Sequence, residues 1–170
     1  MKWRNHKIVT LCAVYAITGG VVPAAAAMFG SVLPDVMELR YGDQSKGVLQ
    51  HRTVTHYPPF WAAVCLPIWF LYRHGGYSSW SLYFAFFLVV GGIFHLAEDA
   101  LSVGGIPLKT PYGKAHGAGF YRVGTFSEEA IAFGCVFSFI CISSIRGYFK
   151  NEHVCEQAAL LVKALKSAVS

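Results

Sequence analysis

Histidines and carboxylates recur in this chain at spacings that suit a metal centre, and the clearest case closes an apolar run. The stretch from Gly91 to Pro111 reads GGIFHLAEDALSVGGIPLKTP and places His95 four residues before Asp99. On a helix, positions i and i+4 share a face, so these two side chains can point at one spot. Ionisable groups are costly in a membrane segment, which makes them functional candidates. As an isolated pair they also fit a buried, hydrogen-bonded His–Asp contact.

Two further motifs carry similar chemistry. HRTVTH supplies His51, Arg52 and His56 directly before an apolar run. The alternative reading of this motif is an interfacial cluster that binds lipid phosphate through Arg52. In VLPD, Asp35 follows a proline, where a carboxylate also commonly caps a helix. His6 lies in a basic N-terminal arm and is explained equally well as a part of that arm.

The composition indicates an integral membrane protein rather than a soluble domain. Of the 170 residues, 55% are hydrophobic, 15% aromatic and only 14% charged, a balance typical of small polytopic proteins. The net charge of +5 comes from basic residues in loops and tails, so anionic lipid headgroups explain it better than nucleic acid does. We therefore expect membrane lipid as a partner and no nucleic acid. The five cysteines form no CxxC pair, which argues against a disulfide framework.

The first apolar stretch, Ile8–Leu33, decides whether the N-terminal arm reaches the other motifs. A glycine pair and Pro23 interrupt it. As one straight helix it would hold His6 and Asp35 ~44 Å apart on opposite membrane faces. If the stretch folds back at the break, His6 and Asp35 return to the same membrane side, and the basic arm joins them there. The positive-inside rule then predicts that this side, with the site, faces the cytoplasm. A cleaved signal peptide fits the alanine run but not the apolar residues that continue beyond it.

Two later apolar runs, at 60–72 and 80–101, predict a helical hairpin through the bilayer. The LPD and HRTVTH motifs precede the descending helix and the His95/Asp99 pair ends the ascending one, so all should meet at one membrane face. The loop at 102–127 and the start of the last run, at 128–145, lie on that face too. The candidate ligands gathered there are His6, Asp35, His51, His56, His95, Asp99, His116 and the Glu128/Glu129 pair.

We expect an all-α polytopic membrane bundle of roughly four to five helices, some shorter than a full span. Residues 1–150 would form a membrane-embedded, metal-dependent hydrolase domain. Residues 151–170 would form an amphipathic C-terminal tail on the membrane surface, because apolar residues recur at helical spacing from Val154 to Val169.

Imidazole and carboxylate donors without cysteine suit Zn²⁺, Mn²⁺ or Fe²⁺, and we expect one to three divalent ions, with zinc favoured. Such a site suits a phosphoesterase that attacks lipid or lipid-linked phosphate with a metal-bound hydroxide. Arg52 would hold a phosphate oxygen or steady the developing charge. The rival interpretations are a metal-ion or proton transport pathway and a non-catalytic assembly subunit that binds metal only for stability.

The order of the motifs is itself specific. It runs Asn5-His6, GSVLPD at 30–35, HRTVTH at 51–56, HLAED at 95–99, GIPLKTPYG at 105–113 and YRVGTFSEE at 121–129. This set resembles the YdjM family of bacterial inner-membrane proteins, thought to be metal-dependent hydrolases and remotely similar to zinc-dependent phospholipases C and single-strand nucleases, which are all-α enzymes. The resemblance implies metal binding at His6, Asp35, His56, His95 and Asp99, and less directly at His51, His116 and Glu128 or Glu129.

The candidates follow from both lines of reasoning. We take Asp35, Arg52 and Glu128 as catalytic candidates, with Asp35 as a bridging ligand or base. The metal candidates are His6, Asp35, His51, His56, His95, Asp99, His116 and Glu129. Two positions depart from the family pattern: Met37 stands where a second aspartate is often found, with Glu38 as a possible substitute, and Ser102-Val103 stands where Thr-Pro is common.

Overall fold

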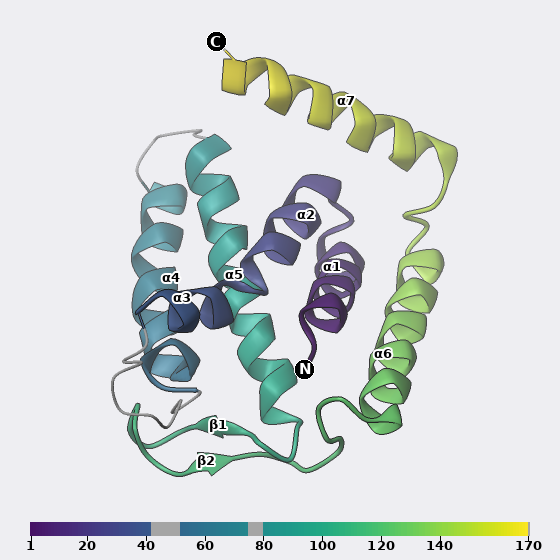
Figure 1. The fold of residues 1–170 in the computed structure, drawn as a ribbon. Coiled ribbons are helices and arrows are strands. Elements are labelled where there is room, and N and C mark those ends of the chain that lie inside the picture. The colour runs from purple at the N-terminus through teal and green to yellow at the C-terminus, as the bar shows by residue number, and fades with distance from the viewer. Residues whose placement is uncertain (42–51, 75–79, 170) are drawn as a thin grey trace.

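The computed structural model describes residues 1–41, 52–74 and 80–169. Within these ranges the chain is a helical bundle with one short two-stranded ribbon (Figure 1). Its elements are α1 (Trp3–Thr18), α2 (Val21–Gly30), α3 (Leu33–Tyr41), the 3₁₀ turn η2 (Val54–His56), α4 (Pro58–His74), α5 (Trp80–Ala100), β1 (Ile106–Pro107), β2 (Ala115–His116), α6 (Phe126–Ile145) and α7 (Asn151–Val169). Helices α1, α2, α4, α5 and α6 pack into the bundle, which confirms the predicted all-α membrane architecture.

Three stretches of the described chain are long and apolar enough to cross a membrane: Val21–Glu38, Trp80–Ala100 and Phe126–Ile145. The first of these bends, because α2 ends at Gly30 and α3 begins at Leu33. Helix α4 has 17 residues with Pro67 inside it. At 1.5 Å per residue it measures about 25 Å, slightly less than the ~30 Å hydrocarbon core of a bilayer.

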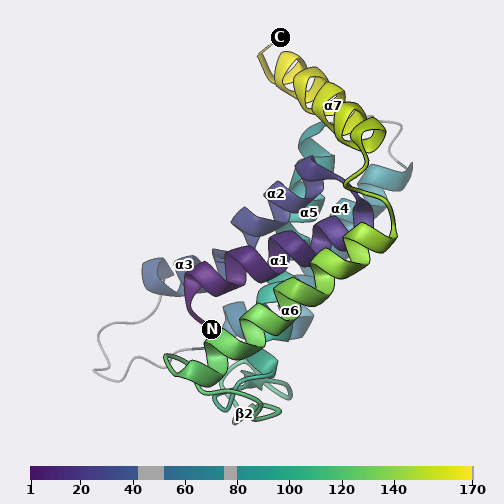
Figure 2. The same cartoon turned by 90° about the vertical axis from the view of Figure 1, so that its right-hand side faces the viewer.

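The N-terminal apolar stretch folds back on itself between α1 and α2. Gly19 ends α1 with a φ of 67° and donates its N–H to Tyr15 O at 2.7 Å. A side chain is disfavoured at this φ, so glycine permits the reversal. Helix α2 then packs against α1, while α6 runs along another side of α1 (Figure 2). The start of α1 and the start of α3 are consequently neighbours, and Trp3 Nε1 donates to Asp35 Oδ2 at 2.7 Å.

Helices α2 and α5 approach so closely that their backbones touch. A Cβ built on Gly91 would lie 2.0 Å from Ala27 O, and one on Gly30 would lie 1.8 Å from Leu88 O. Small residues allow this kind of packing between membrane helices. Because α2 leads directly into α3, the contact fixes Asp35 beside the C-terminal half of α5.

The connection from α5 to α6 crosses one end of the bundle, and α7 lies at the other (Figure 1). In the connection, β1 pairs antiparallel with β2, with Ile106 opposite His116. Ile106 is buried in the cluster around Trp61, which attaches the ribbon to the bundle. The C-terminal tail predicted as amphipathic is helical over α7.

Candidate metal centre

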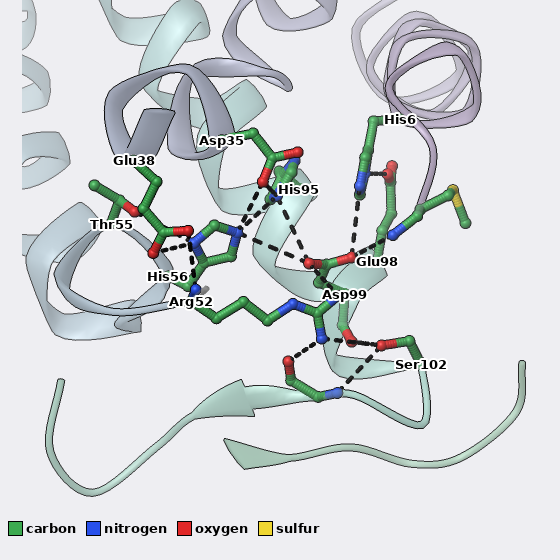
Figure 3. A network of polar contacts seen from close by, with 12 residues as sticks. His6, Asp35, Glu38, Arg52, Thr55, His56, His95, Glu98, Asp99 and Ser102 are labelled. Carbon is green, nitrogen blue, oxygen red and sulfur yellow. Dashed lines mark hydrogen bonds and ion pairs between the residues drawn. The ribbon is translucent and has the colours of Figure 1, made fainter. Parts of the chain in front are cut away.

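Five ionisable side chains from four elements meet inside the bundle, near the α5–α6 connection (Figure 3). His6 comes from α1, Asp35 from α3, His56 from η2, and His95 and Asp99 from α5. The three histidines expose none of their surface, and the two aspartates expose 9% and 1%. The fold-back of α1 and the α4–α5 hairpin therefore bring distant motifs into one pocket, as the topology predicted.

The donor atoms form two overlapping groups of three. In one group are His6, His95 and Asp99, and in the other Asp35, His56 and His95; within each, the donor atoms lie within 4.8 Å of one another. His95 belongs to both groups. Its Nε2 lies 3.1 Å from His56 Nε2, 3.6 Å from Asp35 Oδ1 and 3.8 Å from Asp99 Oδ2.

Each histidine is oriented through its Nδ1 atom. His95 Nδ1 lies 2.6 Å from the carbonyl of Ser31, which can only accept, so this nitrogen carries the proton. His6 Nδ1 lies 2.5 Å from a Glu98 carboxylate oxygen, and His56 Nδ1 lies 3.3 Å from a Glu38 oxygen. A hydrogen bond at Nδ1 fixes the ring and leaves Nε2 as the ligating atom, which is the usual arrangement of metal-binding histidines.

The three Nε2 atoms turn toward the two aspartates. His56 Nε2 lies 3.3 Å from Asp35 Oδ1, and His6 Nε2 lies 3.5 Å from Asp99 Oδ1. His6 Nε2 is buried and makes no hydrogen bond to any residue in the described ranges. Burial opposes protonation of His56, but its contacts with Asp35 and Glu38 outweigh burial and raise its pKa. The carboxylates next to His56 thus favour a positive charge at this ring.

Asp99 is also held by cationic groups. Its Oδ2 lies 2.8 Å from an Arg52 guanidinium nitrogen, and its Oδ1 accepts from the Met1 amine at 2.6 Å. Arg52 has a φ of 73°, in the left-handed region that non-glycine residues seldom adopt. Glu38 holds this backbone by accepting from Arg52 N at 2.9 Å and Thr53 N at 2.5 Å. A strained backbone held in this way is typical of functional sites.

The α5–α6 connection covers the cluster on one side. The guanidinium of Arg52 donates to Ser102 Oγ at 3.3 Å and to the carbonyl of Gly105. Tyr121 is buried and donates its hydroxyl to Glu98 O at 2.7 Å. Burial, followed by the nearby Asp99 and Glu98 carboxylates, raises the pKa of Tyr121, so its hydroxyl stays protonated. Arg52, predicted to hold phosphate, therefore joins Asp99 to the connecting loop.

Of the remaining candidates, the three that the structure describes lie outside this cluster. His51 lies outside the described residues. His116 is exposed on β2. Glu128 is buried but accepts from Lys2 N at 2.6 Å, Asn5 Nδ2 at 2.8 Å and Gly124 N at 2.7 Å. Glu129 forms ion pairs with Lys2 and Arg4 at 3.1 and 2.9 Å.

These contacts give the two glutamates partners other than the histidines of the cluster. Glu128 anchors the start of α1 to α6, and Glu129 pairs with the basic arm at the surface. Both lie on the predicted membrane face, but they belong to neither group of donors. The predicted topology put the start of α6 on the same face as the cluster. It could not show which neighbours the carboxylates of Glu128 and Glu129 would contact.

The structure adds two residues to the site, Glu38 and Glu98. Glu98 accepts from Thr10 Oγ1 at 3.0 Å as well as contacting His6, and Glu38 joins His56 to the backbone of residues 52 and 53. The sequence contained a signal for each. Glu98 lies within the HLAED motif, and Glu38 directly follows Met37, which stands where the family often has a second aspartate. Glu38 was considered as a substitute ligand and Glu98 was given no role, whereas the structure shows both as acceptors for histidine Nδ1 atoms.

The donor set fits a divalent metal. Three imidazoles and two carboxylates without a thiolate match zinc, manganese and iron. The Nε2 atoms of His56 and His95 face each other at 3.1 Å, and two lone pairs at that separation repel unless a proton or an ion lies with them. His6, Asp35, His56, His95 and Asp99 are therefore the residues that would hold metal.

The fold and the cluster define a polytopic membrane protein with a buried histidine–carboxylate centre. Comparison with protein families identifies the particular family: the model of the YdjM inner membrane protein family matches residues 1–165. The chain belongs to this family, as its motif order predicted. Searches of curated proteins and of solved structures found no match.

Proposed function

We propose that this protein is a metal-dependent hydrolase of the inner membrane that cleaves phosphate esters of lipids or lipid-linked molecules. The observation that carries the proposal is the shared orientation of three buried histidines. Each has an acceptor at Nδ1 and turns Nε2 toward Asp35 and Asp99. A structural histidine needs only one such contact, whereas a ligand needs its second nitrogen directed at a common point.

A divalent ion, with zinc favoured, would supply Lewis acidity and lower the pKa of a bound water. The residues of the chain have separate tasks around it. Glu38 and Glu98 keep their histidines in the ligating tautomer. Asp35 takes a hydrogen bond from Trp3 on one oxygen and faces two histidines with the other, so it can bridge ions or accept a proton.

The substrate class follows from the position and charge of the pocket. Arg52 brings a fixed positive charge to the pocket, and its side chain is 10% exposed. Guanidinium groups recognise phosphate oxygens well. The cluster also lies beneath the loop that joins two candidate membrane spans, which places it near the bilayer surface. A phosphate ester carried on a lipid satisfies both conditions.

We also propose that the site faces the cytoplasm. The fold-back places Lys2 and Arg4 beside Glu129 at the start of α6, so the basic N-terminal arm shares a side with the α5–α6 connection. That connection carries Lys109, Lys114 and Arg122. An excess of basic residues on one side marks the cytoplasmic face.

The proposal is tested by measuring metal and hydrolysis together. Full-length protein purified in detergent should contain zinc or another divalent ion by elemental analysis. His56→Ala should lower this content, because it breaks the group of Asp35, His56 and His95. The metal-loaded protein should release product from at least one member of a panel of phospholipids, lipid-linked phosphates and phosphodiesters, and His56→Ala should not. A folded, metal-loaded protein that cleaves nothing in the panel would contradict hydrolysis and favour a non-catalytic metal-binding role.

A further inference from the structure

The loop between α5 and α6 is placed at the membrane surface by the helices that it joins. It leaves α5 after Ala100 and enters α6 at Phe126, and both helices are candidate membrane spans. A segment that connects the ends of two spans on one side lies at the headgroup level of that side. Its outer face must therefore meet water, lipid headgroups or a partner.

The outer face of this loop is basic and apolar and has no acidic residue. Between Asp99 and Glu128 the sequence holds no Asp or Glu. Leu108, Tyr112 and Phe120 expose 52%, 67% and 65% of their surface. The basic side chains interleaved with them are also exposed, and none forms an ion pair with a described residue. We call this the hairpin surface; it comprises Leu108, Lys109, Tyr112, Lys114, Phe120 and Arg122.

The hairpin surface is held in place from beneath. Ile106 and Tyr121 are 3% and 1% exposed and point into the bundle. The Tyr121 hydroxyl bonds to Glu98 O, and the guanidinium of Arg52 bonds to Ser102 and Gly105. The inner side of the loop is thus part of the pocket wall, while its outer side presents aromatic rings and positive charge. A fixed platform of this kind loses little entropy on binding.

We propose that the hairpin surface binds the headgroups of anionic phospholipids, with its apolar side chains inserted at the headgroup–acyl boundary. Aromatic residues favour that boundary, and lysine and arginine next to it attract anionic lipids. The charge pattern decides the occupant: a protein partner or a zwitterionic surface would not require a face without acids. The inference depends on the membrane setting of the loop and does not require the proposed hydrolase activity.

The consequence is that anionic lipid would gather beside the loop that covers the buried cluster. Because the same loop contacts Arg52 and Glu98 on its inner side, a lipid held on its outer side would lie next to the pocket. Binding there would raise the local concentration of anionic lipid without any contact to the candidate metal ligands.

The experiment compares lipid binding by the full-length protein with binding by a variant of the loop. Native mass spectrometry would measure the preference for phosphatidylglycerol over phosphatidylcholine in wild type and in K109Q/K114Q/R122Q. Each basic residue near an anionic surface contributes about fivefold to binding, so removing three of them should lower the preference by up to about a hundredfold. The matched control, K109R/K114R/R122K, keeps a positive charge at each of the three positions and should keep the preference.

Hydrogen exchange locates the effect. In nanodiscs of phosphatidylcholine with phosphatidylglycerol, amides at 108–122 should exchange more slowly than in phosphatidylcholine alone, and the triple variant should lose this difference. Y112S/F120S, which keeps every charge, should lose part of it. The proposal is overturned if the control variant loses the lipid preference equally, if exchange in the loop ignores lipid charge, or if a single-stranded oligonucleotide protects the loop as well as phosphatidylglycerol does.

Discussion

The two ends of the bundle use histidine and arginine in different ways. Where α1 turns into α2, Arg146 donates to the carbonyls of Ala16 and Ile17 at 2.9 and 3.0 Å, and His153 donates to Gly19 O at 2.7 Å. These carbonyls belong to the C-terminal turn of α1, where helices leave acceptors unpaired. At this end the polar side chains complete the hydrogen bonding of a helix.

At the other end, the histidines bond to acceptors and still have a second nitrogen directed at carboxylates. His6 bonds to Glu98 through Nδ1, and its Nε2 faces Asp99. His153 differs, because its ring stacks on Tyr148 with centroids 5.0 Å apart and contacts a carbonyl. The comparison teaches that the environment of the second ring nitrogen separates a structural histidine from a candidate ligand.

The largest effect is expected for Asp99→Ala. This change removes the carboxylate that faces Arg52, His6 and the Met1 amine. A buried cation left without its partner costs about 3–5 kcal/mol, so the thermal midpoint in detergent should fall sharply. The metal held by the group of His6, His95 and Asp99 should be lost. Asp99→Asn, which keeps the shape, should recover part of the stability but not the metal. Wild-type metal content in Asp99→Ala would contradict a metal centre at this end.

The next prediction separates the two groups of donors. His95 belongs to both, whereas His6 belongs to one. His95→Ala should therefore abolish metal binding. His6→Ala should leave the group of Asp35, His56 and His95 able to bind metal, but the protein should bind fewer ions or bind them with lower affinity. Elemental analysis of both variants gives the stoichiometry. Equal metal content in the two would show that the groups do not act as separate sites.

Sequence reasoning found the parts of the site that depend on topology. The glycine break after α1 and the apolar hairpin bring His6, Asp35, His56, His95 and Asp99 to one end, and helical spacing put the last two on one face. These features depend on backbone direction and chain connectivity, which residue patterns encode directly. The same reasoning found the all-α bundle, because long apolar runs in a membrane must hydrogen-bond internally.

The parts that sequence reasoning missed depend on side-chain direction. Glu129 and Glu98 are both carboxylates near predicted helix ends, yet one pairs with the basic arm and the other with His6. His116 lies within the loop predicted at 102–127, and its pairing opposite Ile106 in the ribbon leaves it exposed while Ile106 is buried. Which neighbour a side chain meets is set by packing between elements, and no local pattern contains that information.

A smaller effect is expected for the acceptors that orient the histidines. Glu38→Gln and Glu98→Gln should each weaken metal binding by about 10–100-fold, the usual cost of losing such a contact, while the protein stays folded. Metal titration monitored by calorimetry would measure it. Glu129→Gln is the matched control, because it removes a carboxylate that pairs with Lys2 and Arg4 outside the cluster, and it should leave metal affinity unchanged. If Glu129→Gln lowered the metal affinity as much as Glu38→Gln does, the loss would come from the change in net charge and not from the contact with the histidine.

The smallest effect tests the capping end of the bundle. His153→Ala removes one hydrogen bond to Gly19 O and should lower stability by about 1 kcal/mol, visible as a small shift of the thermal midpoint in detergent. Metal affinity should not change, because His153 contacts the end of α1 remote from His6. His153→Asn can still donate to the carbonyl and should recover part of the stability. If His153→Ala instead lowered the metal content as His56→Ala does, the contacts of a histidine ring would not separate structural histidines from ligands. The assignment of the cluster as a metal centre would then lose its structural basis.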